Sequence, residues 1–182
     1  MNKLVLVTGA CINTGVDIVK KFASNGWDVI FTGRDNEPVE EKEKEYSIEF
    51  PNIRIKGMHA EALLDEQHVN TLPIAKIKEL IEKEFGKIDA LVLNAADLGI
   101  NLSVYEPNID AFQRVMNTNA SWNYYIIETL LPLFNKESGS IVFINSNTAY
   151  RAIPNRVAYS ASKGAQLGMM RALALDLGKG SL

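Results

Sequence analysis

Short apolar runs alternate with amphipathic stretches along most of this chain. The first run, Leu4–Val7, is rich in β-branched side chains and ends in Thr8-Gly9. A helical spacing of apolar residues follows from Val16 to Phe22 and ends at Asn25-Gly26. This order predicts a strand, then a glycine turn, then a helix.

The same alternation continues through the rest of the chain. Further strands are predicted at Val29–Thr32, Ile53–Met58, Ile88–Leu93 and Ile141–Ile144. Helices are predicted at Glu37–Tyr46, from about Asp65 to Phe85 with a break near Pro73, at Phe112–Leu131, and from near Tyr159 past Leu177.

Apolar strands that alternate with helices are typical of a parallel sheet covered on both faces. Right-handed crossovers make such a sheet doubly wound. The 182 residues, of which 47% are hydrophobic, suffice for one continuous core. We therefore predict an α/β fold, a Rossmann-like doubly wound parallel sheet with helices on both faces, formed by a single domain over residues 1–182.

Charge and composition argue against several classes of protein. The chain has 19 Lys and Arg against 22 Asp and Glu, and the basic residues gather on no stretch, so neither a nucleic acid nor a membrane surface is indicated as a partner. No apolar run approaches the roughly 18 residues that span a bilayer. Cys11, His59 and His68 offer no disulfide, no zinc-ligand spacing and no catalytic role. We expect a cytoplasmic protein without a metal.

The segment TGACINTG lies where the first strand gives way to a helix. Free backbone N–H groups and the positive end of a helix can bind a phosphate there, provided that small side chains let it approach. An ordinary tight turn is the alternative, but the position after the first strand favours a dinucleotide site. Its predicted contacts are Thr8, Gly9, Cys11, Asn13, Thr14 and Gly15.

Tyr159 and Lys163 are four residues apart in a predicted helix, so their side chains share one face. A phenol that exchanges protons near neutral pH needs its pKa lowered by roughly three pH units, or roughly 4 kcal/mol. One cation at about 4 Å, in an effective dielectric of about 20, supplies a similar amount. An exposed tyrosine–lysine pair without function is the alternative.

Two polar residues complete the candidate chemistry. Ser146 follows the fifth strand, in the crevice where doubly wound folds bind ligands, and its hydroxyl can donate to a carbonyl oxygen. Asn119 lies in an otherwise apolar helix, where an ordinary buried amide is the alternative to a functional residue.

These motifs, in this order, resemble the short-chain dehydrogenase/reductase family over nearly the whole chain. The steps of 27 residues from Asn119 to Ser146, 13 to Tyr159 and 4 to Lys163 are those of the family's Asn-Ser-Tyr-Lys tetrad. The segment Leu93-Asn94-Ala95-Ala96 resembles the family's Asn-Asn-Ala-Gly phrase, which adds Asn94, Ala95 and Ala96 to the cofactor contacts.

The resemblance implies a role for each tetrad residue. Tyr159 would exchange a proton with the substrate oxygen, and Ser146 would polarise that oxygen. Lys163 would bind the nicotinamide ribose and lower the pKa of Tyr159, and Asn119 would hold a water that relays protons from Lys163. The implied substrate is a small molecule with a carbonyl or alcohol group, and the cofactor supplies the hydride.

Cofactor choice depends on the residues after the second strand. Gly33 stands where members that use NAD place an acidic residue, and Arg34 can pair with a 2′-phosphate. We therefore expect NADP, with NAD as the alternative. Glu61 is the expected adenine contact, with Asp65 as its alternative.

The chain departs from the family pattern at Asn13, which replaces a loop glycine, and at Ala96. A catalytically impaired cofactor-binding or scaffolding subunit is therefore the alternative function. Family members also continue through two further strands after the last predicted helix. We expect either a fragment of a longer protein that ends at Leu182, or a partner that covers the fifth strand.

Two helices resemble those through which family members associate. One carries Trp122, Tyr124 and Tyr125, and the other carries Tyr159. We expect a homodimer or homotetramer, with simple coverage of the sheet as the alternative role of these aromatic residues.

Overall fold

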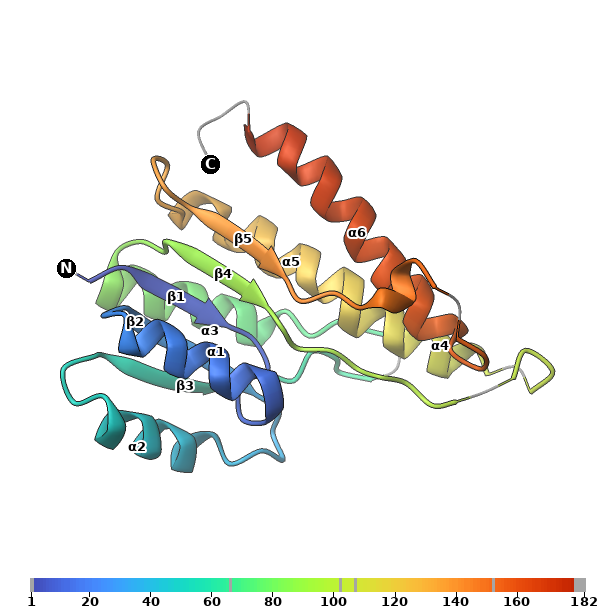
Figure 1. The fold of residues 1–182 in the computed structure, drawn as a ribbon, viewed down its shortest axis with the longest axis horizontal. Helices are drawn as coiled ribbons and strands as arrows, with labels where there is room; N and C mark the ends of the chain where they lie inside the picture. The colour runs from blue at the N-terminus through green and yellow to red at the C-terminus, as the bar shows by residue number, and fades with distance from the viewer. Residues whose placement is uncertain (1, 66, 102, 107, 152, 179–182) are drawn as a thin grey trace.

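In the part of the chain that the structure describes, five parallel strands form one sheet in the order β3-β2-β1-β4-β5. The computed structural model describes residues 2–178 except 66, 102, 107 and 152. The strands are β1 (Leu4–Val7), β2 (Asp28–Gly33), β3 (Ile55–His59), β4 (Ala90–Leu93) and β5 (Ser140–Phe143). All five point the same way, so the loops that follow them gather at one edge of the sheet (Figure 1).

Among the described residues, six α-helices connect or follow these strands (Figure 1). They are α1 (Asn13–Ser24), α2 (Val39–Glu49), α3 (Leu72–Leu80), α4 (Ile109–Met116), α5 (Trp122–Leu130) and α6 (Val157–Gly178). The α/β, doubly wound architecture predicted from the alternation of elements is confirmed.

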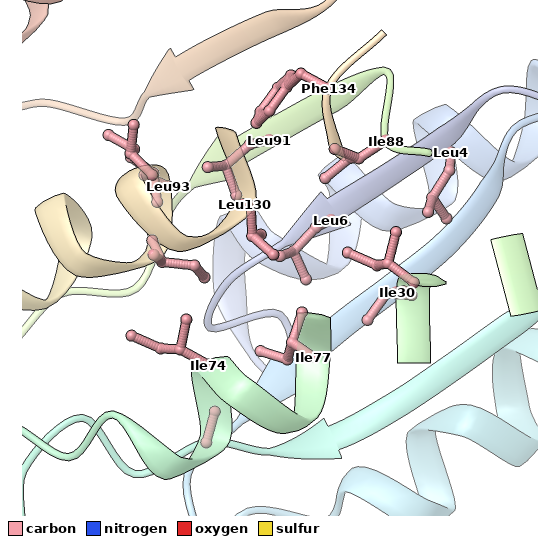
Figure 2. Close-up of a cluster of buried hydrophobic side chains, with 14 of the residues drawn as sticks. Leu4, Leu6, Ile30, Ile74, Ile77, Ile88, Leu91, Leu93, Leu130 and Phe134 are labelled. Atoms are coloured by element: carbon pink, nitrogen blue, oxygen red, sulfur yellow. The ribbon is translucent and has the colours of Figure 1, made fainter. Parts of the chain in front are cut away.

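The strands bury both faces because their side chains alternate in direction. Leu4 and Leu6 of β1 pack into the core that α3 and α5 cover, and Figure 2 shows Leu6 among Ile77, Leu91 and Leu130. The intervening β1 residues Val5 and Val7 join a second core with residues of α1 and α2. A continuous apolar strand is therefore what two covered faces require.

The sheet reverses its winding between β1 and β4. Strands β2 and β3 lie on one side of β1, whereas β4 and β5 lie on the other. Connections leave in opposite directions at such a point, and a crevice opens beyond the carboxyl ends of the two central strands. Gly9, after β1, and Asn94, after β4, lie at this point.

The predicted helix over 65–85 is wrong in its first part. Asp65 instead closes a turn by accepting the backbone N–H groups of Gln67 and His68, and α3 begins at Leu72. Pro73 lies in the first turn of α3, where its missing N–H breaks no helical bond. It therefore begins the helix rather than interrupting it.

The predicted helix over 112–131 contains a π-helical turn, η2 (Asn117–Ser121), between α4 and α5. The backbone N–H of Trp122 donates to the carbonyl of Asn117, five residues earlier. Such wide turns release carbonyl groups from the regular ladder and are frequent at functional sites. Here the turn carries Asn119, which is fully buried.

Strand β5 is the edge of the sheet formed by the described residues, and its exposed and half-buried side chains alternate. Leu182 lies outside the described residues, as do the other positions after Gly178.

The aromatic residues of α5 differ in exposure: Trp122 packs in the core, whereas Tyr124 and Tyr125 are exposed. No helix in the described part of the chain is long and apolar enough to cross a membrane.

Candidate active site

A cleft of about 630 Å³ lies beyond the carboxyl ends of the strands, at the point where the sheet reverses. Most of the residues expected to bind a cofactor line it. These are Gly9, Asn13, Thr14, Arg34, Glu61, Asn94, Ala95, Ala96, Tyr159 and Lys163. Thr8, Cys11, Gly15 and Asn119 lie behind these lining residues and contact them as described below. Ser146 follows Asn145, which lines the cleft, and the backbone N–H of Ser146 donates to Asn145 Oδ1 across 2.7 Å.

The loop after β1 is held tightly against the loop after β4. Thr8 Oγ1 accepts the backbone N–H groups of Asn94 and Ala95, each across 3.0 Å. Gly9 has a φ of +64°, and a Cβ atom there would lie 2.8 Å from the Cα atom of Ala95. A Cβ atom on Gly15 would lie 2.6 Å from the Cα atom of Ala10. Both glycines are therefore required by close backbone approach.

Helix α1 begins at the floor of the cleft. Its N-cap residue is Ile12, and no side chain caps the helix. The first-turn residues Asn13 and Thr14 line the cleft, so the uncapped N–H groups and the positive end of the helix dipole are offered to a ligand there. Asn13 has a φ of 51°, and the asparagine thus adopts the left-handed conformation that a glycine would adopt more easily.

Arg34 and Glu37 form an ion pair beside the end of β2. The guanidinium Nε of Arg34 donates to Glu37 Oε1 across 3.2 Å, and the backbone N–H of Arg34 donates to Glu37 Oε2 across 3.0 Å. The Arg34 side chain is 61% exposed, whereas that of Glu37 is 11% exposed. This pair orients a guanidinium at the mouth of the cleft, next to Gly33.

Cys11 is buried beneath this corner rather than in the cleft lining. A Cβ atom on Gly33 would lie 2.5 Å from its Sγ atom, so the thiol fills the space under the strand end. Burial, together with the nearby Glu37 carboxylate, raises the pKa of the Cys11 thiol to about 11. The thiol is therefore neutral near pH 7.

Glu61 and Asp65, the alternative adenine contacts, lie in different surroundings. Glu61 follows β3 and lines the cleft. Asp65 is exposed and accepts hydrogen bonds from the backbone and ring of His68. The geometry therefore brings only Glu61 of the two to the cleft.

Tyr159 and Lys163 lie one turn apart on α6 and both line the cleft. The Lys163 Nζ atom is 5.7 Å from the centroid of the Tyr159 ring, and the guanidinium carbon of Arg156 is 5.9 Å from the same centroid. Lys163 is only 2% exposed. Its Nζ donates to the carbonyl of Ile144, just after β5, across 2.9 Å. Burial lowers the pKa of the Lys163 ammonium to about 8.

Both the side chain and the main-chain carbonyl of Asn119 form hydrogen bonds with other protein groups. Its Oδ1 accepts the backbone N–H of Asp97, and its Nδ2 donates to the carbonyl of Asp97 and to Ser162 Oγ. Its main-chain carbonyl accepts hydrogen bonds from the side-chain amides of Asn123 and Gln166, each across 2.8 Å. Asn119 therefore fastens the loop after β4 to α6.

Ser146 caps the short helix η4 (Asn147–Ala149) after β5. Its hydroxyl oxygen accepts from the backbone N–H and the hydroxyl of Thr148, across 3.2 and 3.0 Å. Because both bonds use the acceptor side, the hydroxyl hydrogen of Ser146 can be donated to a substrate oxygen.

Several residues of the site were not predicted from the sequence. Thr32 Oγ1 accepts the backbone N–H of Gly9 across 3.1 Å, and Arg114 pairs with Asp97 at 3.2 Å. Gln166 contacts both Asn119 and Lys163. Only the strand-end position of Thr32 was a usable signal, because the other contacts join segments distant in sequence.

The fold and the position of the cleft define a Rossmann-type α/β protein. The sequence profile of the short chain dehydrogenase family matches residues 3–181. The chain therefore belongs to the short chain dehydrogenase family of oxidoreductases.

Relatives and solved structures agree with this assignment. An uncharacterized oxidoreductase of Staphylococcus saprophyticus is 30% identical over 98% of this chain and 73% of its own length. A 3alpha-hydroxysteroid dehydrogenase of Mediterraneibacter gnavus is 29% identical over 97% of this chain and 68% of its own. A crystal structure of a short chain dehydrogenase from Escherichia coli CFT073, complexed with NADPH, has a TM-score of 0.87 and 27% identity, over 99% of this chain and 74% of that one.

Proposed function

We propose that this protein is an NADP(H)-dependent oxidoreductase that transfers a hydride between the nicotinamide and a carbonyl or alcohol substrate. The observation that carries the proposal is the placement of the Lys163 ammonium 5.7 Å from the Tyr159 ring, in the same cleft as the glycine loop. A dinucleotide site and a proton-exchanging pair are the two parts that such a reaction needs.

The residues of the cleft fit a dinucleotide. The tight approach of Gly9 and Gly15 leaves the uncapped start of α1 open for the pyrophosphate, next to Asn13 and Thr14. Glu61 would contact the adenine, and Asn94, Ala95 and Ala96 would line the path toward the nicotinamide. When bound, the nicotinamide supplies or accepts the hydride.

The remaining chemistry belongs to side chains of this chain. The Tyr159 hydroxyl would give a proton to the substrate oxygen during reduction and take it back during oxidation. Lys163 lines the cleft, and its Nζ would stabilise the phenolate and donate to the ribose hydroxyls. The Ser146 hydroxyl would donate to the substrate oxygen as negative charge develops on it.

Arg34 supports NADP(H) over NAD(H). Its guanidinium is exposed at the cleft mouth, and Glu37 bonds only its Nε among the side-chain nitrogens, so Nη1 and Nη2 can pair with a 2′-phosphate. The NADPH complex of the Escherichia coli relative supports the same choice. We expect Arg34→Gln to weaken NADPH binding about tenfold or more, with NADH binding changed much less. Equal losses for both would contradict this role.

The mechanism is tested with Tyr159→Phe. We expect turnover of a panel of aldehydes and ketones to fall about a hundredfold or more, with NADPH binding, followed by its fluorescence, largely kept. Tyr105→Phe is the matched control, since Tyr105 is 92% exposed, and should leave turnover unchanged. Undiminished turnover in Tyr159→Phe would remove Tyr159 from the chemistry.

The scaffold alternative, motivated by Asn13, makes a different prediction in the same assay. NADPH would bind to the wild-type protein, but no carbonyl substrate of the panel would be turned over.

A homodimer or homotetramer that associates through α5 and α6 is a further part of the proposal. The exposure of Tyr124 and Tyr125 on α5 supports it, and light scattering, which gives the mass in solution, tests it.

A further inference from the structure

Gln166 fills the space between the Lys163 ammonium and the main chain of Asn119. Its side chain is fully buried, on the same face of α6 as Ser162 and Lys163. Its Nε2 donates to the Asn119 carbonyl oxygen across 2.8 Å, and its Oε1 accepts from Lys163 Nζ across 3.1 Å. One neutral amide thus joins the two groups directly.

The orientation of this amide follows from its neighbours. A main-chain carbonyl oxygen can only accept, so the amide nitrogen of Gln166 must face Asn119. The amide oxygen then faces Lys163, whose ammonium can only donate. In a flipped amide, the Gln166 oxygen would face the Asn119 carbonyl oxygen, and the Gln166 nitrogen would face the Lys163 ammonium. Neither pair could form a hydrogen bond.

The polar atoms of Asn119 are already bonded to protein groups. Its side chain joins Asp97 and Ser162, and its carbonyl accepts from both Asn123 and Gln166. Asn119 therefore reaches Lys163 through the Gln166 side chain. Because an amide does not titrate near neutral pH, this link fixes a position but passes no proton.

We propose that Gln166 is a positioning residue of the active site, whose amide oxygen anchors the Lys163 ammonium and whose amide nitrogen ties it to Asn119. The Ile144 carbonyl is the other acceptor that Lys163 contacts among the described residues, and no carboxylate there pairs with it. Tyr159, on the same helix, is the titratable group in contact with it. Gln166 thus supplies half of the hydrogen bonds that hold a buried cation.

Two variants separate positioning from simple packing. Gln166→Met keeps the volume but removes both bonds, and should lower the midpoint of Lys163 titration by about one pH unit, since a bond to a charged group is lost. Gln166→Glu places a carboxylate against the ammonium, and should raise that midpoint. The midpoint is followed in the cofactor-free protein through the side-chain NMR signal of Lys163, identified by its absence in Lys163→Met.

The control is Gln113→Met on α4, which removes a glutamine hydrogen bond to Asn117 and should leave the Lys163 midpoint unchanged. Unchanged midpoints in both Gln166 variants would overturn the inference. If Gln166→Met does not fold, Gln166→Glu decides alone, by a raised or an unchanged midpoint.

The inference about turnover rests on the proposed function. There, the alkaline limb of the pH–rate profile should move in the same two directions as the midpoints, because the charged Lys163 is the form that stabilises the phenolate. If the alkaline limb of the pH–rate profile stays in place in both variants while the Lys163 titration midpoint moves, Gln166 has only a structural role. That result would overturn its role in positioning Lys163 for catalysis. Shifted midpoints in a protein that turns over no carbonyl substrate would instead refute the proposed function, leaving the anchoring of Lys163 intact.

Discussion

The side chain of Asn94 donates to the main-chain carbonyl of Gly9 across 2.7 Å and thereby joins the loop after β4 to the loop after β1. The same Nδ2 atom donates to the carbonyl of Thr8 across 3.1 Å. These two loops form the two sides of the crevice at which the sheet reverses. The Asn94 amide and the Thr8 hydroxyl, which accepts two N–H groups of the loop after β4, together set the width of the proposed cofactor site.

Asn94→Asp should weaken this connection without changing the size of the side chain. A carboxylate offers no donor, so it would face two carbonyl oxygens, and we expect the free energy of unfolding to fall by about 2 kcal/mol. NADPH binding should weaken about tenfold because the loops separate. Asn25→Asp is the matched control, since exposed Asn25 also donates to a carbonyl, that of Lys21, but outside the cleft. Equal losses in both variants would show that Asn94 has no special role.

Gly9→Ala tests the close approach of the same loops. Gly9 and Gly26 both have positive φ, at +64° and +81°, but a Cβ atom on Gly26 would meet no atom within 4 Å. Gly26→Ala should therefore cost only the conformational strain, about 1 kcal/mol. Gly9→Ala should cost about 2 kcal/mol more, because Ala95 must move, and should also abolish NADPH binding. Urea unfolding of both variants measures the difference, and equal costs would rule out the steric explanation.

Asn13→Gly should improve the proposed cofactor site. Glycine adopts the φ of 51° without strain and removes a side chain from the cleft, so we expect NADPH to bind several-fold more tightly. Asn155→Gly is the control, because Asn155 has a φ of 59° but does not line the cleft. Both variants should change stability by less than about 1 kcal/mol. Tighter binding in Asn155→Gly as well would mean that backbone strain, not the Asn13 side chain, is responsible.

The sheet could be predicted from the sequence because its strands are buried on both faces. The ends of each predicted strand lie within two residues of the observed ends, and for Leu4–Val7 the two coincide. The segment before α3 could not be predicted, since its acidic and apolar residues have helical spacing. Asp65 nevertheless uses its carboxylate to close a local turn, and this competes successfully with the helix.

The site was predictable where its residues lie in a short local motif, such as the loop after β1, or at a regular helical spacing. Tyr159 and Lys163 share a helix face, so four residues of sequence sufficed to bring them together. The link from Asn119 to Lys163 uses a main-chain carbonyl in a π-helical turn and a glutamine 47 positions away. Neither the turn nor that contact leaves a periodic signal in the sequence.

The buried ammonium of Lys163 makes stability depend on pH in a defined direction. Its pKa is about 8 in the folded protein, against an ordinary value of 10.5, because burial disfavours the charged form. Between these values the unfolded chain binds more protons than the folded one, so this group makes the free energy of unfolding rise with pH, by about 3 kcal/mol at most. Below about pH 8 both states carry the proton, and the contribution is constant.

The prediction is measured as the difference between wild type and Lys163→Met, unfolded in urea without cofactor at several pH values from about 7 to 10. The stability of the wild type relative to the variant should be constant near pH 7 and should increase above about pH 8. The Cys11 thiol has the opposite effect, because its raised pKa of about 11 makes stability fall above its ordinary value of 9.0. That contribution is present in both proteins and cancels in the difference, so parallel curves would mean that Lys163 titrates in the folded protein as it does in the unfolded chain.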